Sequence, residues 1–131
     1  MQVLVDTNVI VDITGDSNEW LTWSISQVEK HVGCLLINPI IYAELCIPLD
    51  SADEVDRLVA VFGLEYLELP KAALFLAARA FRRYRQCGGT KSAPLPDFFI
   101  GAHAAALEIP ILTRDVGRYA TYFPEVTLIT P

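Results

Sequence analysis

Short apolar runs of strand length alternate with helical stretches along the whole chain, and this alternation restricts the fold more than any other feature. The apolar runs begin near residues 2, 34, 64, 109 and 126, and helix-forming segments separate most of them. Strands that alternate with helices usually pair in parallel, because each helix carries the chain back to the starting edge of the sheet. We therefore expect a three-layer α/β sandwich in which helices flank a central parallel sheet of four or five strands.

Capping residues and helix breakers mark where the expected helices begin and end. Asp16 with Glu19, and Ser51 with Glu54, have the spacing of capping boxes, which predicts helix starts at both places. Asn38 followed by a proline predicts an N-cap and a first helical turn. The expected helices run over residues 17–32, 39–47, 51–62, 70–87 and 97–107, with a turn or short helix at 114–119.

Length and composition indicate one folded domain over residues 1–131. A hydrophobic fraction of 53% beside 20% charged residues is typical of a globular chain with a substantial core. No apolar run approaches the roughly 20 residues of a membrane span, and the N-terminus lacks the basic and apolar regions of a signal peptide. Cys34, Cys46 and Cys87 show no metal-binding or redox spacing, so we expect reduced thiols. These observations favour a cytoplasmic protein without membrane contact.

The distribution of charge is more informative than the net charge of −6. The segment from Lys71 to Pro96 contains no acidic residue and six of the ten basic residues of the chain. Phosphate contacts dominate the affinity of proteins for RNA, so such a basic stripe suits an RNA backbone; the alternative is an exposed helix face that aids solubility. The candidates for contact with RNA or a protein partner are Arg79, Arg82, Arg85 and Lys91.

Four acidic residues occupy positions that a parallel sheet would bring together. Asp6 and Asp115 follow two apolar runs that we expect to form neighbouring strands. Asp97 opens a helix that is small and apolar nearly all round, and Glu44 lies among apolar residues of an earlier helix. Each has an ordinary alternative: Asp6, Asp97 and Asp115 could be caps, and Glu44 could be a plain exposed residue. Their joint placement favours a site at the carboxyl edge of the sheet.

Clustered carboxylates repel one another, so such a site would have raised pKa values or need a cation. Oxygen ligands without His or Cys beside them select Mg²⁺ or Mn²⁺ over Zn²⁺. A metal of this kind can generate a hydroxide nucleophile and stabilise the charge that develops on a phosphodiester. The residues alone therefore predict a divalent-metal-dependent phosphodiesterase.

The ordered motifs resemble those of PIN-domain nucleases over essentially the whole chain. These motifs are Asp6-Thr7-Asn8 after the opening strand, Glu44 in the second expected helix, Asp97 followed by Gly101-Ala102, and Leu112-Thr113-Arg114-Asp115. The order and the length are similar to those of VapC toxins of bacterial toxin–antitoxin pairs. The resemblance implies a PIN-like fold and an endoribonuclease that cuts structured RNA, commonly tRNA or ribosomal RNA.

The same resemblance assigns roles to individual residues. Asp6, Glu44, Asp97 and Asp115 would be the catalytic acids that bind Mg²⁺ or Mn²⁺, with Asn8 and Thr113 as supporting polar groups. A cognate VapB-type antitoxin would silence the enzyme, and antitoxins of this class often insert a basic residue near the acids. We also expect a homodimer.

Two other functions remain as alternatives. A phosphatase of the haloacid-dehalogenase type would use Asp6 as its nucleophile, but it needs a second Asp two residues later, where this chain has Asn8. A catalytically silent PIN-like module would bind RNA or a protein partner without cutting it. The complete set of four acids favours the nuclease, because a degenerate copy should have lost some of them.

Overall fold

A parallel five-stranded sheet organises the part of the chain that the computed structural model describes, residues 1–15 and 19–131. Its strands lie in the order β3-β2-β1-β4-β5, and each neighbouring pair is parallel. The expected α/β sandwich with a central parallel sheet of four or five strands is confirmed. The strands are β1 (Val3–Val5), β2 (Leu35–Ile37), β3 (Glu65–Tyr66), β4 (Ile111–Leu112) and β5 (Leu128–Ile129).

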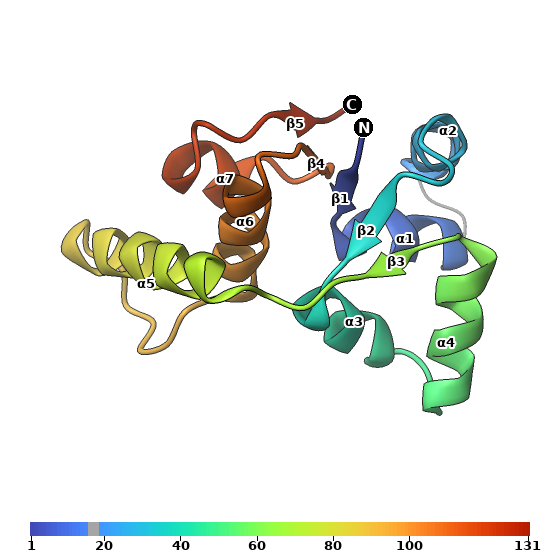
Figure 1. The fold of residues 1–131 in the computed structure, drawn as a ribbon, viewed down its shortest axis with the longest axis horizontal. Coiled ribbons are helices and arrows are strands. Elements are labelled where there is room, and N and C mark those ends of the chain that lie inside the picture. The colour runs from blue at the N-terminus through green and yellow to red at the C-terminus, as the bar shows by residue number, and fades with distance from the viewer. Residues whose placement is uncertain (16–18) are drawn as a thin grey trace.

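Seven helices surround the sheet within the described residues: α1 (Thr7–Thr14), α2 (Leu21–Lys30), α3 (Pro39–Cys46), α4 (Ala52–Val61), α5 (Lys71–Gln86), α6 (Pro96–Leu107) and α7 (Gly117–Tyr122). Figure 1 shows them in two groups: α5, α6 and α7 gather on the β4–β5 side, whereas α1 to α4 lie around β1, β2 and β3. Helices α3 and α6 are in contact and join the two groups. The two chain ends lie near each other (Figure 1).

The first helix was not expected from the sequence. Helix α1 begins directly after β1, with Asp6 as its N-cap, because the Asp6 carboxylate accepts a hydrogen bond from the backbone N–H of Thr7 at 2.8 Å. Val9 and Ile10 of this helix are fully buried, and this packing outweighs the low helix propensity of its β-branched residues. The expected capping box at Asp16 lies outside the described residues.

The caps of α3 and α4 agree with the sequence in part. The Asn38 side chain accepts a hydrogen bond from the N–H of Ile41, as expected of an N-cap. Ser51 caps α4 through the N–H of Glu54, but the Glu54 carboxylate accepts from the N–H of Asp50 rather than from that of Ser51. The box therefore closes one residue earlier than the expected motif.

Helix α5 packs through a face that the sequence predicts in part. Of the residues expected on its apolar face, Phe81 and Tyr84 pack against the core, whereas Leu74, Phe75 and Ala78 are exposed. The buried positions of the helix are instead three alanines, Ala73, Ala77 and Ala80. Helix α6, against which α5 packs, is rich in Gly and Ala, and the rings of Phe81 and Tyr84 on α5 also contact the Phe98 ring on α6. No helix of the described residues is long and apolar enough to cross a membrane.

Candidate functional site

Buried polar residues mark the carboxyl edge of the sheet. Asp6, Asn38 and Thr113 directly follow β1, β2 and β4, and all three are buried. The chain turns to opposite sides of β1 to form β2 and β4, so the sheet has its topological switch point here. Ligands of open α/β sheets bind in the crevice outside such a point. This edge is therefore the candidate active site.

Asp6 is the most heavily hydrogen-bonded acid of this edge. Its Oδ2 accepts from the Thr113 hydroxyl at 2.9 Å, from the Tyr119 hydroxyl at 3.0 Å and from Asn8 Nδ2 at 3.2 Å. These donors favour the ionised carboxylate, but burial dominates, and together with the charge of Asp97 it raises the pKa of Asp6 to about 6. Asp6 is thus a carboxylate kept out of water without a full counter-charge.

Hydrogen bonds from Thr113 and Asn8 fix the position of Asp6 relative to the segment after β4. The backbone N–H of Arg114 donates to Asn8 Oδ1 at 3.3 Å, so the Asn8 amide group points its N–H₂ toward Asp6 and Thr113. The Thr113 hydroxyl oxygen in turn accepts from the backbone N–H of Asp115 at 3.0 Å. The supporting positions expected for Asn8 and Thr113 therefore lie beside Asp6.

Glu44 reaches the same edge from α3. Its Oε1 accepts a hydrogen bond of 2.9 Å from the Thr7 hydroxyl, which connects this acid to the residue that follows Asp6. Burial raises the pKa of Glu44, the Thr7 hydrogen bond opposes the rise, and the charge of Asp97 adds to it. Glu44 is half-buried and is not a plain exposed helix residue.

Asp97 lies in the first turn of α6 and couples the other three acids electrostatically. Its charge raises the pKa of both Asp6 and Glu44, and its own pKa is raised by burial and then by the charge of Asp115. Arg118 of α7 lies 3.6 Å from Asp97 Oδ2 and opposes that rise. The N-cap positions of α6 and α7 are Leu95 and Val116, so neither Asp97 nor Asp115 is a helix N-cap.

The four acids share one edge, but they do not stand as a ready-made ligand set. In residues 1–15 and 19–131, no three His, Cys, Asp or Glu side chains are grouped closely enough to hold a metal ion. The donor chemistry nevertheless fits a hard divalent cation, because the acids supply oxygen ligands only, and burial, with repulsion between the acids adding to it, raises the pKa values of Asp6, Glu44 and Asp97. Side-chain movement within this edge would be needed to bring the ligands together.

Several residues of the site were missed by the sequence analysis. Thr7, Arg118 and Tyr119 each contact one of the acids, and burial strongly raises the pKa of Tyr119, which keeps it a hydrogen-bond donor to Asp6. The available signal was the spacing of Arg118 and Tyr119, three and four residues after Asp115. In the short helix expected over residues 114–119, that spacing would place them one turn beyond the acid.

A second polar cluster connects the segment after β4 to helices α1 and α2. Arg114 forms a two-pronged ion pair with the buried Asp12 of α1, at 2.7 and 3.1 Å, and the Ser24 hydroxyl donates to the same carboxylate. The Arg114 guanidinium also lies over the Trp20 ring, 5.9 Å from its centroid. The residue between Thr113 and Asp115 is therefore held in place by α1 and α2.

Asn38 and His103 tie α3 to α6. Asn38 Oδ1 caps α3, so its amide N–H₂ is left to donate to His103 Nδ1 at 3.2 Å. Burial lowers the pKa of His103, which favours the neutral ring that can accept this bond. This buried hydrogen bond thus links α3, which carries Glu44, to α6, which carries Asp97.

The predicted basic residues all lie at the surface, on α5 and the loop after it. Arg79 lies over the Phe75 ring, and Arg85 donates to the carbonyl oxygens of Gly89 and Lys91 at 3.3 and 3.0 Å. Arg85 therefore shapes the loop that leads to α6, while Arg79, Arg82 and Lys91 are exposed.

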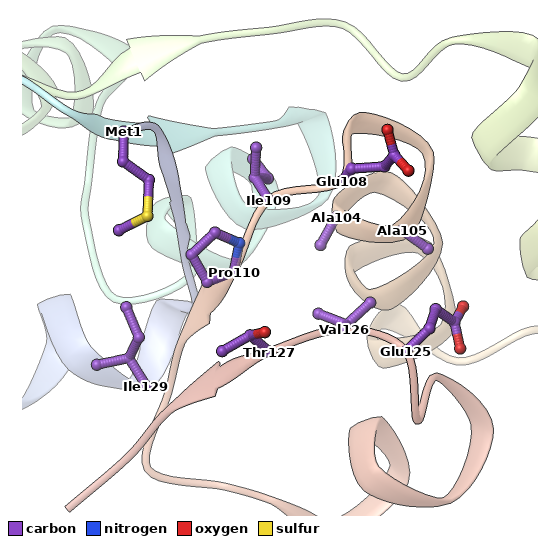
Figure 2. A pocket seen from close by; sticks show the side chains of 10 residues that line it. All are labelled: Met1, Ala104, Ala105, Glu108, Ile109, Pro110, Glu125, Val126, Thr127 and Ile129. Carbon is purple, nitrogen blue, oxygen red and sulfur yellow. The ribbon is translucent and has the colours of Figure 1, made fainter.

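A cavity of about 470 Å³ lies at the other edge of the sheet (Figure 2). Met1, Pro110 and Thr127, which line it, precede β1, β4 and β5, whereas the acids follow β1 and β4. None of the four acids is among its lining residues. The site argued from the acids is therefore separate from this cavity.

Comparison with known proteins agrees with the fold. The PIN domain family model matches residues 3–123. No curated protein matches the sequence. Among solved structures, VapBC2 from Rickettsia felis, bound to a DNA fragment from its promoter, superposes with a TM-score of 0.73 at 18% identity, covering 99% of this chain and 98% of the other.

Two further structures cover 99% of this chain and 98% of their own. A toxin–antitoxin complex from Klebsiella pneumoniae has a TM-score of 0.73 at 18% identity. FitAcB from Neisseria gonorrhoeae has a TM-score of 0.70 at 20% identity. At these identities, the three superpositions establish a shared fold.

Proposed function

The chain belongs to the PIN domain family, and from this premise we propose that it is a divalent-metal-dependent endoribonuclease. In this proposal it is the toxin of a VapBC-type toxin–antitoxin pair, works in the cytoplasm and hydrolyses structured RNA such as tRNA or ribosomal RNA. The observation that carries the proposal is Asp6, a buried carboxylate with a raised pKa at the switch point of a parallel sheet. A cation is what such a carboxylate lacks.

Asp6, Glu44, Asp97 and Asp115 would hold Mg²⁺ or Mn²⁺. When bound, the metal supplies an activated water and charge stabilisation for phosphodiester hydrolysis. The Thr113 hydroxyl and the Asn8 amide hold Asp6 in one orientation, and the Thr7 hydroxyl holds Glu44. These donors keep the acids ionised and aimed at the edge of the sheet.

A protein partner is the second part of the proposal. The solved structures of this fold include toxin–antitoxin complexes, which supports a small VapB-type antitoxin as the cognate partner of this chain. We also propose a homodimer. Arg79, Arg82 and Lys91 would contact the RNA backbone or the antitoxin, whereas Arg85 would act through the loop that it holds.

Expression under tight induction tests the enzyme. The chain, its Asp6→Asn and Asp97→Asn variants, and Asp53→Asn as a matched control would each be induced, followed by sequencing of RNA 5′ ends. Asp53 is exposed in the first turn of α4. New RNA ends and growth arrest are expected for the wild type and Asp53→Asn, and neither for the other two.

Two results would contradict the proposal. New RNA ends that persist in Asp6→Asn would exclude the acid site as their source. If no new ends appear and growth is unaffected, a silent module that binds RNA or a protein becomes the better account.

A further inference from the structure

Helix α7 touches two of the acids with two consecutive residues. Arg118 Nη1 lies 3.6 Å from Asp97 Oδ2, and the next residue, Tyr119, donates its hydroxyl to Asp6 Oδ2 at 3.0 Å. The tyrosine is buried and neutral, so it adds no charge to the site. Arg118 therefore brings a positive charge directly to Asp97.

The two arginines beside the acids differ in how firmly they are held. Arg114 is fixed by its two-pronged pair with Asp12. Arg118 has a single, longer contact, and its side chain is 42% exposed, so it can leave Asp97 for solvent at small cost. Its contact is with the acid whose charge acts on Asp6 and Glu44.

We propose that Arg118 is the internal counterion of the acid site: it pairs with Asp97 in the metal-free protein, must leave for a divalent metal to bind, and then contacts a phosphate of the RNA. The inference rests on the proposed function, because it takes the acids as metal ligands. A guanidinium and a metal ion compete for the same Asp97 oxygens, since two cations repel each other at this distance. The released guanidinium can form two parallel hydrogen bonds to a phosphate.

Metal affinity tests the first half of this proposal without any activity measurement. MnCl₂ would be titrated calorimetrically at low ionic strength into metal-free wild type, Arg118→Gln and Arg118→Lys, with Arg57→Gln as the control. Arg57 is an exposed arginine of α4 that donates to the backbone oxygen of Asp53.

Loss of the competing charge should tighten Mn²⁺ binding in Arg118→Gln by about two- to fivefold, the range of an exposed ion pair. Arg118→Lys and Arg57→Gln should stay near the wild type, and high salt should reduce the difference. Equal or weaker Mn²⁺ binding by Arg118→Gln would overturn the proposal.

RNA affinity tests the second half. Binding of bulk tRNA would be measured in CaCl₂ over a series of NaCl concentrations. The slope of log K against log salt is negative, and its magnitude reports the number of phosphate contacts. Loss of one contact in Arg118→Gln should reduce that magnitude by about one. An unchanged slope would show that Arg118 does not contact the phosphate and would overturn this half of the proposal.

The same titrations separate this inference from the proposed function. Mn²⁺ binding that is lost in Asp97→Asn but unchanged in Arg118→Gln would overturn only the role of Arg118. Absence of Mn²⁺ binding by the wild type would overturn the metal-dependent function and, with it, the role of Arg118.

Discussion

The titration of Asp6 should leave a measurable imprint on the stability of the metal-free protein. Its pKa is about 6 in the folded chain against a usual value of 3.8. Because the folded state binds this proton more tightly than the unfolded state, protonated Asp6 favours folding at low pH. The corresponding stability is fully present below about pH 4, is lost as the pH rises through 6, and stays lost at higher pH.

The difference between the two pKa values corresponds to about 3 kcal/mol, at 1.36 kcal/mol per unit. About 2 kcal/mol of this falls between pH 4.5 and 8, a range open to urea titration. The substitution Asp6→Asn abolishes the ionisation. It also disturbs hydrogen bonds to Asn8, Thr113 and Tyr119, but that cost does not follow the titration of residue 6.

The quantity to measure is therefore the free energy of unfolding of Asp6→Asn minus that of the wild type, in EDTA, at several pH values. This difference should rise by about 2 kcal/mol from pH 4.5 to 8. The Asp53→Asn control should run parallel to the wild type, because its side chain is exposed to water. If the difference in unfolding free energy between Asp6→Asn and the wild type does not change with pH, the argument that Asp6 is buried without a counter-charge is refuted.

Three further predictions test the supporting residues. Thr113→Val removes a hydrogen bond that lowers the pKa of Asp6, so the pH of this stability loss should move upward in the same urea series. Arg114→Gln leaves the buried Asp12 without its ion pair and should cost about 1–3 kcal/mol in urea unfolding, whereas Arg57→Gln should cost almost nothing. Gly101→Ala would push a methyl group into the ring of the buried Phe123 and should cost about 1–3 kcal/mol, and an unchanged melting temperature would contradict the close packing of α6.

The sheet could be predicted from the sequence because its strands are short apolar runs bounded by turn and capping residues. The adjacency of β1 and β4 followed from parallel topology, and the structure confirms it. Helix α1 could not be predicted, because Val9, Ile10 and Val11 form a β-branched apolar run, which is more typical of a strand than of a helix. Only the cap at Asp6 and the burial of Val9 and Ile10 turn that segment into a helix.

The packing face of α5 was predicted only in part, since Phe81 and Tyr84 pack against the core as expected but Leu74 and Phe75 do not. Large apolar residues usually face the core, yet helices that approach closely must meet through small ones. Ala73, Ala77 and Ala80 permit such an approach to α6, and Leu74 and Phe75 are left outside. The spacing of the alanines at 73, 77 and 80 is visible in the sequence, but the sequence does not show that α5 packs on α6, whose side chains are mostly small.

At the acid edge, the sequence located the four acids but not the side chains that hold them. Asp6 and Thr113 could be placed because each directly follows a strand. The positions of Arg118 and Tyr119 depend on how α7 packs against α6 and α5, which the sequence alone does not show.

Because Arg118 and Tyr119 contact the acids, the docking of α7 is coupled to the charge of the acids. Helix α7 has six residues, no side-chain cap, and a single buried residue, Tyr119. Isolated helices of this length are unstable in water, so α7 exists only because it is docked. Two of its docking contacts are made to Asp97 and Asp6. Whatever binds these acids must therefore change how α7 is held, and whatever holds α7 must change how strongly the acids bind a cation.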